Sequence, residues 1–186
     1  MVVEEGGTFI SNYLLFRPVK TVQMYPTVTL AGEGAVASLN SIVIAHPGSE
    51  VDLGARVILK APHSRAEIIA RTITTGGVSL SRGHLIGLAP DIKAHLECRG
   101  LILAPTGAII AIPELEGRVA GVDMSHEAAV GRIAAEEIEY LMARGLNEEE
   151  AVSTIVRGFL RVKIEGLPPA LEEEMDQAIK ETGRGL

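Results

Sequence analysis

The 186-residue sequence contains one cysteine, no tryptophan, three tyrosines and three phenylalanines. The single cysteine, Cys98, excludes a disulfide framework within the chain. It also excludes a four-cysteine zinc or cluster site contributed by one chain alone. The scarcity of aromatic side chains, together with 20 glycines, favours β-structure dense in turns over a helix bundle. With 47% apolar residues the chain can bury a substantial core, as one domain or one domain with a helical appendage.

Two further absences concern the compartment. No apolar run approaches the roughly 20 residues of a membrane-spanning helix. The first residues, Met1–Glu5, are acidic and lack the basic and apolar regions of a signal peptide. We therefore expect a soluble, cytoplasmic protein.

The net charge of −7 gives no indication of nucleic acid or an anionic membrane as a partner. Residues 134–186 contain 12 acidic and 6 basic side chains, a net charge of −6, whereas residues 1–133 contain 12 and 11, a net charge of −1. The excess negative charge is therefore concentrated at the C-terminal end. A solvated helix surface is the simpler interpretation, and a docking face for a basic partner surface is the alternative.

Short apolar or alternating segments recur along the first two thirds of the chain, separated by turns rich in Gly and Pro. The predicted strands are Thr8–Phe16, Lys20–Met24, Thr27–Leu30, Ser41–Ala45, Arg56–Lys60, Glu67–Ile73, Gly77–Leu80, His84–Leu88, Gly100–Leu103 and Ala108–Ile112. Many short strands with regular turns predict a sandwich, a barrel or a solenoid. Small residues at the corners and β-branched interiors suit a β-helix. The phrase Leu-Ala-Pro, at Leu88–Pro90 and Leu103–Pro105, suggests stacked equivalent corners.

The period changes after Ile133, where three helical apolar stripes follow one another. The first contains Ala134, Ile138, Leu141 and Met142; the second Ala151, Val152, Ile155, Val156, Phe159 and Leu160; the third Leu171, Met175, Ala178 and Ile179. Gly145 is the expected residue after the first helix, and Asn147 with Glu150 is typical of a capping box for the second. Such short stripes cannot form a stable core alone, so we expect them to pack on the β-part, on a partner, or on both.

Three sequence patterns are candidates for a cofactor-binding or metal-binding site. Gly32–Ala37 matches the G-x-G-x-x-A dinucleotide fingerprint, but a Gly-rich turn is the favoured interpretation because no helical stripe follows. His95 and Cys98 form H-x-x-C, which on a strand places the two side chains on opposite faces. His126 and Glu127 are adjacent, so on a strand they also face opposite ways. From the residues alone, a strand end leading into the helical region explains this last pair.

Several segments, in order, resemble the signature of the SufB/SufD family of iron–sulfur cluster assembly proteins. Met124–Ile133 resembles the element S-H-[EG]-A-T-x-[SG]-[RK]-I, with Ala129 in place of Thr, and Glu136–Leu146 resembles the helix E-x-x-x-Y-L-x-S-R-G-[IL], with Ala143 in place of Ser. The further matching segments are Cys98–Leu103 (with Arg99 in place of Asp), Pro113–Glu116, Asn147–Ala151, Ile155–Phe159 and Leu167–Pro168.

The resemblance implies a mainly β fold, a right-handed parallel β-helix over residues 1–133 followed by a small C-terminal α-helical region over residues 134–186. It also implies a minimal or truncated member that covers the C-terminal half of the family pattern. Cys98, Glu127 and His126 are the residues it assigns to holding an iron–sulfur cluster. The expected partners are a second copy or a paralogue through the β-helix, and a separate ABC-type ATPase, the SufC component, on the C-terminal helices. The chain itself has no P-loop motif.

Three functions remain open. The first is a non-enzymatic scaffold subunit of the SUF system that builds a transient iron–sulfur cluster in a homodimer or heterodimer. The second is a SufD-like structural subunit that binds the ATPase but no cluster. The third is a β-helix enzyme acting on polysaccharides, against which the sequence offers no obvious Asp pair and few aromatic side chains.

Overall fold

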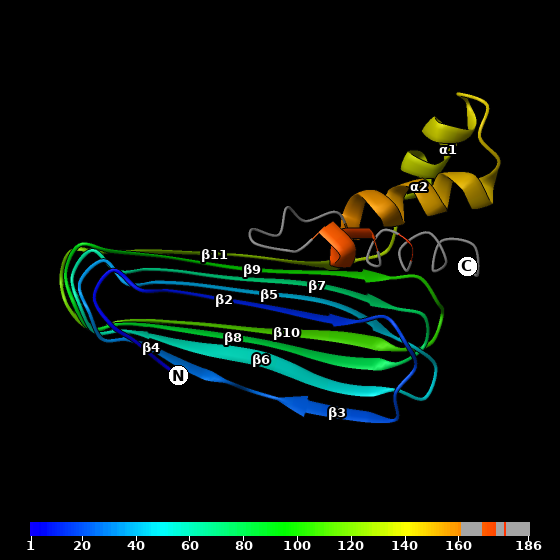
Figure 1. The fold of residues 1–186 in the computed structure, drawn as a ribbon. Helices are drawn as coiled ribbons and strands as arrows, with labels where there is room; N and C mark the ends of the chain where they lie inside the picture. Colours follow the sequence, from blue (N-terminus) through cyan, green and yellow to red (C-terminus); the bar gives the residue numbers. More distant parts are fainter. Residues whose placement is uncertain (161–168, 174–176, 178–186) are drawn as a thin grey trace.

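The computed structural model describes residues 1–160, 169–173 and 177 of the chain (Figure 1). The strands and helices, in chain order, are β1 (Val2–Val3), β2 (Thr8–Leu15), β3 (Thr21–Met24), β4 (Thr27–Leu30), β5 (Val36–Ala45), β6 (Glu50–Leu59), β7 (Arg65–Thr74), β8 (Val78–Gly87), β9 (Ile92–Ile102), β10 (Ala108–Gly117), β11 (Val122–Gly131), α1 (Ala135–Met142) and α2 (Glu148–Leu160).

The strands form two sheets that face each other (Figure 1). One sheet has the order β1-β4-β6-β8-β10, with β3 also paired to β6, and the other has the order β11-β9-β7-β5-β2. Every strand pair is parallel, and the paired residues are a nearly constant distance apart in sequence, as in Glu50 with Val78 and Ile92 with Val122. Each coil of the chain therefore adds one strand to each sheet. This confirms the predicted parallel β-helix, which has about 4 turns and ends in short helices.

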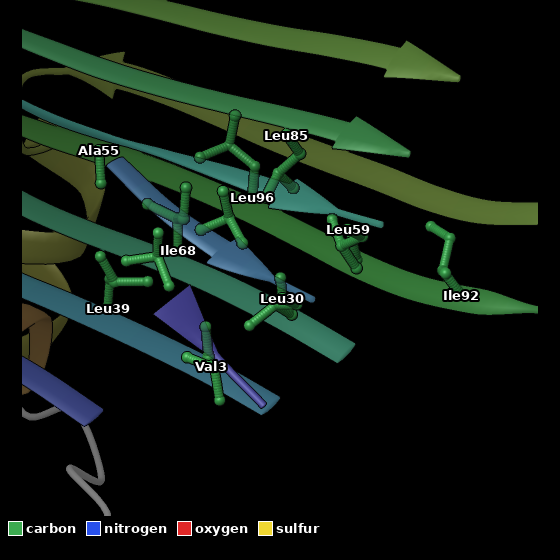
Figure 2. Packing of buried hydrophobic residues seen from close by; sticks show 14 of the residues in the cluster. Val3, Leu30, Leu39, Ala55, Leu59, Ile68, Leu85, Ile92 and Leu96 are labelled. Atoms are coloured by element: carbon green, nitrogen blue, oxygen red, sulfur yellow. The ribbon is translucent and has the colours of Figure 1, made fainter. Parts of the chain in front are cut away.

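The core lies between the two sheets, because alternate residues of each strand point inward. Along β6, for example, Val51, Leu53 and Leu59 are buried while Glu50 is exposed. Figure 2 shows Leu59 among the side chains that fill this interior. The period-2 pattern of the strands is therefore sufficient to separate an apolar inside from a more polar outside.

Several strands are longer than predicted. Gly77–Leu80 and His84–Leu88, predicted as two strands, both fall largely within the single strand β8, and Arg56–Lys60 overlaps only the end of β6. A glycine inside the strand explains the apparent break at Gly83. A Cβ there would lie 2.2 Å from Cδ1 of Leu96 in the facing sheet, so this glycine provides space for a neighbour and does not mark a turn.

Equivalent corners stack along the β-helix. Residues with a left-handed backbone recur at one corner, at Gly6, Gly34, His63, Asp91 and Gly121. The Leu-Ala-Pro phrases do not mark equivalent corners, because Ala89-Pro90 joins β8 to β9 and Ala104-Pro105 joins β9 to β10 at the other end of the coil. That prediction was wrong, since two identical phrases 15 residues apart fall half a coil apart.

The helical region follows the predicted pattern where it is described. Gly145 has φ +97°, and Asn147 and Glu150 form the predicted reciprocal cap, in which each backbone N–H donates to the other residue's side chain at 2.9 Å. The apolar face of α2, which includes Val156 and Leu160, packs with residues of the second sheet such as Ile73. α1 contains no buried residue.

The third stripe is described only in part. Leu171 is exposed within the helical residues 169–173, whereas Met175, Ala178, Ile179 and Leu167–Pro168 lie outside the described residues. Among the described helices, none is long and apolar enough to cross a membrane.

Candidate functional site

The first two sequence patterns do not form sites. Gly32–Gly34 is a turn that leads into strand β5, so the dinucleotide fingerprint lacks the helix that would bind the pyrophosphate. His95 lies on the outer face of β9, where its Nδ1 is 2.9 Å from the hydroxyl of Ser125. Cys98 points to the inside, as the spacing predicts, so the two residues cannot share one metal ion.

Cys98 is one of the most buried residues of the β-helix, with a relative exposure of 1%. It belongs to the interior cluster, and the hydroxyl of Ser81 from the facing sheet donates to its Sγ at 3.8 Å. Burial raises the pKa of the Cys98 thiol above its usual range, because the apolar interior disfavours the thiolate. In the isolated chain the cysteine is therefore a neutral thiol near pH 7.

His126 and Glu127 lie on β11, the next strand beyond the one that carries Cys98. The register pairs His126 with Leu96 and Glu127 with Glu97. His126 therefore shares the inner side of the sheet with Cys98, while Glu127 lies on the outer side. Both are exposed, because β11 belongs to the last coil. The sequence correctly predicted that these neighbours face opposite ways.

The outer face next to Glu127 has a ladder of alternating charges that the sequence analysis did not identify. Arg99 is 3.1 Å from Glu127 and 3.4 Å from Glu97, measured from its Nη2 to the nearest carboxylate oxygen of each. Glu97 in turn lies 2.5 Å from Arg71, whose guanidinium group stacks over the ring of Phe159 on α2. Burial lowers the pKa of Arg71, although the charge of Glu97 opposes this shift.

The three predicted cluster residues therefore do not lie on the same side of the sheet. The sheet separates Glu127 from Cys98, and the described residues include no group of three His, Cys, Asp or Glu side chains that could hold a metal ion. The part of the chain that the structure describes thus does not assemble the three residues. Their assignment as cluster ligands stays a prediction that needs a second chain to complete the site.

The last coil is open. In the described residues β11 pairs only with β9, and β10 pairs only with β8. One backbone edge of each strand therefore carries N–H and C=O groups with no neighbouring strand. Such edges are templates for pairing with another chain.

The fold and this open end define a class: a two-sheeted parallel β-helix whose last coil carries a His-Glu pair and continues into two helices. Residues 2–159 match the family described as "SUF system FeS cluster assembly, SufBD core domain". The chain belongs to this family of iron–sulfur cluster assembly proteins.

Curated relatives agree with the assignment. A protein of Archaeoglobus fulgidus named "Iron-sulfur cluster assembly SufBD family protein" is 55% identical over 184 residues, which cover 99% of this chain and 50% of the relative. A protein of the same name from Methanothermobacter thermautotrophicus is 46% identical over 187 residues, covering 100% and 46%. One from Staphylococcus epidermidis is 37% identical over 164 residues, covering 87% and 35%. The chain thus spans about half the length of the first two relatives.

Proposed function

We propose that the protein is a non-enzymatic scaffold subunit on which an iron–sulfur cluster is assembled, acting with a separate ABC-type ATPase. One observation carries the proposal: the His126-Glu127 pair is exposed on the edge strand β11, directly beside the strand that holds Cys98. An exposed edge next to a thiol is a suitable place for a cluster that is built and then transferred. The cluster is the cargo of this protein.

The proposed ligands are Cys98, His126 and Glu127. Thiolate is the usual ligand of iron in these clusters, and imidazole or carboxylate can complete the coordination when thiols are few. One chain supplies one thiol, so the site needs a second copy or a paralogue that adds its own ligands about a two-fold axis. The unpaired edges of β10 and β11 provide the surface for that partner. Incomplete thiolate ligation would also keep the cluster labile enough to transfer.

The two helices are the proposed docking face for the ATPase. Between α1 and α2 lies a shallow, mainly apolar surface hollow, lined by Glu136, Glu137, Tyr140, Leu141 and Ile155. Tyr140 and Met142 are 57% and 43% exposed, although α1 is amphipathic. An apolar hollow with an acidic rim suits a partner surface that is apolar at its centre and basic at its border.

Anaerobic reconstitution tests the scaffold function. Wild type, Cys98→Ala and the control His95→Ala, which changes an outer-face residue of the same strand, are incubated with ferrous iron and sulfide. The proposal predicts a visible chromophore in wild type and His95→Ala and its loss in Cys98→Ala, with circular dichroism unchanged in all three. Equal chromophores in wild type and folded Cys98→Ala would remove Cys98 from the ligand set.

The second candidate, a structural subunit that binds the ATPase but no cluster, is favoured by the burial of Cys98 and its raised pKa. A buried neutral thiol must be exposed and deprotonated before it binds iron. Titrating the protein with the ATPase in the presence and absence of iron and sulfide separates the two. A scaffold changes its ATPase affinity when loaded, whereas a structural subunit binds equally in both conditions.

A further inference from the structure

The open end of the β-helix has two strand edges, one on β10 and one on β11, and only the edge of β10 contains a proline, Pro113. Successive residues of a parallel strand direct their N–H and C=O groups alternately to its two sides. At the start of β10 and just beyond its end, Ala108 and Arg118 donate to the carbonyls of Gly77 and Gly87, and the register with β8 is unbroken between them. The even-numbered residues of β10 therefore bond to β8. The odd-numbered residues, Pro113 among them, face the open edge.

Pro113 interrupts the open edge of β10. Proline has no N–H, and its ring occupies the place of that group. The missing donor costs nothing in the pairing with β8, which explains why a proline is tolerated inside this strand. A strand added at the open edge, however, would lose a hydrogen bond and meet the ring. β10 is the more apolar of the two edges, with Ile110 50% exposed, so Pro113 protects the edge that would otherwise be the stronger template for aggregation.

The open edge of β11 is continuous. The odd-numbered residues of β9 bond towards β7, as Lys93 does by donating to the carbonyl of Ser64, so the even-numbered residues bond to β11. In a parallel pair, the residue directly opposite a bonding residue points away. Leu96 is opposite His126, so the even-numbered residues of β11 direct their N–H and C=O groups to the open edge. No proline lies in Val122–Gly131, and the row of donors and acceptors is therefore complete.

We infer that a second copy of this chain adds its own β11 to β11 as an antiparallel strand, and that no strand adds to β10. The inference rests on the proposed function and names the surface through which its second copy binds. A two-fold axis across the edge makes the two β11 strands antiparallel, so that each presents the same row of donors and acceptors to the other. β10 then contributes side-chain contacts only.

The acidic side chains of β11 select the register. Backbone groups meet only if even-numbered residues lie opposite even-numbered residues, so the axis can pass through Ser125, His126 or Glu127 near the middle of the strand. An axis at Ser125 places Asp123 opposite Glu127 of the second copy, and an axis at Glu127 places that residue opposite itself. Like charges directly opposite are destabilising. An axis at His126 avoids both, because Glu127 then lies opposite Ser125 of the second copy. In this register β11 is self-complementary over nearly its whole length, which favours a copy of the same chain as the partner.

Proline substitution tests which edge pairs. Ala128→Pro removes an N–H at the open edge of β11, and the matched control Ala111→Pro removes one at the open edge of β10. Neither N–H is used in pairing within the chain. Sedimentation equilibrium of the full chain, both apo and reconstituted anaerobically with iron and sulfide, measures dimerisation. We expect Ala128→Pro to weaken the dimer by about ten-fold or more, since the two-fold axis doubles the loss, and Ala111→Pro to dimerise as wild type. Unfolding midpoints establish that both variants fold.

Charge substitution at Ser125 tests the register. Ser125→Lys should tighten the dimer by about two- to ten-fold, because each lysine lies opposite Glu127 of the other copy. Ser125→Glu should weaken it by a similar factor. An axis at Ser125 would instead place the two lysines opposite each other and reverse the effect of Ser125→Lys.

Three results would overturn the pairing of β11 with its copy: wild type that is monomeric in both forms, folded Ala128→Pro that dimerises as tightly as wild type, or folded Ala111→Pro that weakens the dimer as much as Ala128→Pro does. A dimer that Ser125→Lys weakens would overturn the register. Failure of the proposed function gives a different pattern, in which folded Cys98→Ala forms the same chromophore as wild type whatever the dimer does.

Discussion

The central coils and the last coil of the β-helix have strands of similar length in the same register, yet they differ in what covers them. On β9, Ile92, Leu96 and Cys98 are at most 1% exposed, whereas on β11 Val130 is 41% exposed. Both strands alternate inward and outward residues in one register, so the alternation itself does not explain the difference. In the part of the chain that the structure describes, β9 has a neighbouring strand on both sides and β11 has one on a single side. Burial in this fold is thus determined by stacking, and within the described residues no further strand stacks on the last coil.

The two helices repeat the contrast. α2 buries Val156 and Leu160 against the second sheet, while α1 buries nothing and leaves Tyr140 exposed. The covered elements hold the fold together, and the uncovered ones are the surfaces on which the proposed partners would bind. The proposed function therefore lies in a different part of the chain from most of the stability, which paired substitutions can test.

The largest difference is expected between a central and a terminal apolar side chain. Leu96→Ala removes a fully buried side chain and should lower the free energy of unfolding by about 2–5 kcal/mol. Val130→Ala, on the last coil, should cost less than about 1 kcal/mol because Val130 is already partly exposed. Urea denaturation followed by circular dichroism measures both. Equal costs would show that the last coil is covered in the isolated chain.

Ion pairs should show the same difference between covered and exposed positions, with smaller losses of stability. Glu97→Gln leaves Arg71 without its charge partner under α2 and should cost about 2–3 kcal/mol, somewhat less than the loss of a partner in a fully buried pair. Lys93→Gln breaks an exposed pair between β9 and β11 and should cost less than about 0.5 kcal/mol. Thermal unfolding at low and high salt measures both, and only Lys93→Gln should show an effect that salt abolishes.

Glycines provide a test that adds only one methyl group. A Cβ at Gly83 would lie 2.2 Å from a fully buried leucine side chain, so Gly83→Ala should cost about 1–3 kcal/mol. A Cβ at Gly131, at the end of β11, has nothing within 4 Å, so Gly131→Ala should be within about 0.5 kcal/mol of wild type. Unfolding midpoints of both variants measure these costs in stability. A Gly83→Ala variant as stable as wild type would mean that the interior can rearrange.

The smallest expected effect is a pH dependence specific to Cys98. Its pKa is raised in the folded chain, so the buried neutral thiol contributes stability that is fully present below the unfolded pKa of about 8.5. That contribution is lost as the pH rises from there towards the folded pKa, by up to about 1.4 kcal/mol per pH unit. Wild type should therefore lose stability between pH 8 and 9.5 faster than Cys98→Ala. Parallel pH profiles would mean that the thiol is accessible to solvent in the folded state.

The parallel β-helix and the helices after it could be predicted because each rests on a local signal or on the family resemblance. Turn residues separate the strands, and Asn147 with Glu150 marks the start of α2. The opposite directions of His126 and Glu127 follow from strand geometry alone. The sequence pattern alone did not show that β8 is one strand. A glycine between two apolar segments is typical of a turn, and only the structure shows that Leu96 of the facing sheet occupies the space beside Gly83.

The charge ladder could not be predicted for a related reason. Arg99 and Glu127 are 28 residues apart, and no local period links them. Their contact depends on the number of residues in a coil, which varies with the length of each corner. The departure of Arg99 from the family pattern was visible in the sequence, but its partner was not.

We propose that the cluster residues form a site only when the open last coil meets a partner. The most direct test of this proposal is the molar mass of the iron-loaded protein, measured by size-exclusion chromatography with light scattering during anaerobic reconstitution of wild type and Cys98→Ala. The account predicts that the wild-type chromophore elutes with a dimer and that Cys98→Ala forms no chromophore at any mass. A chromophore that elutes with a monomer would contradict the account, because one chain would then complete the site.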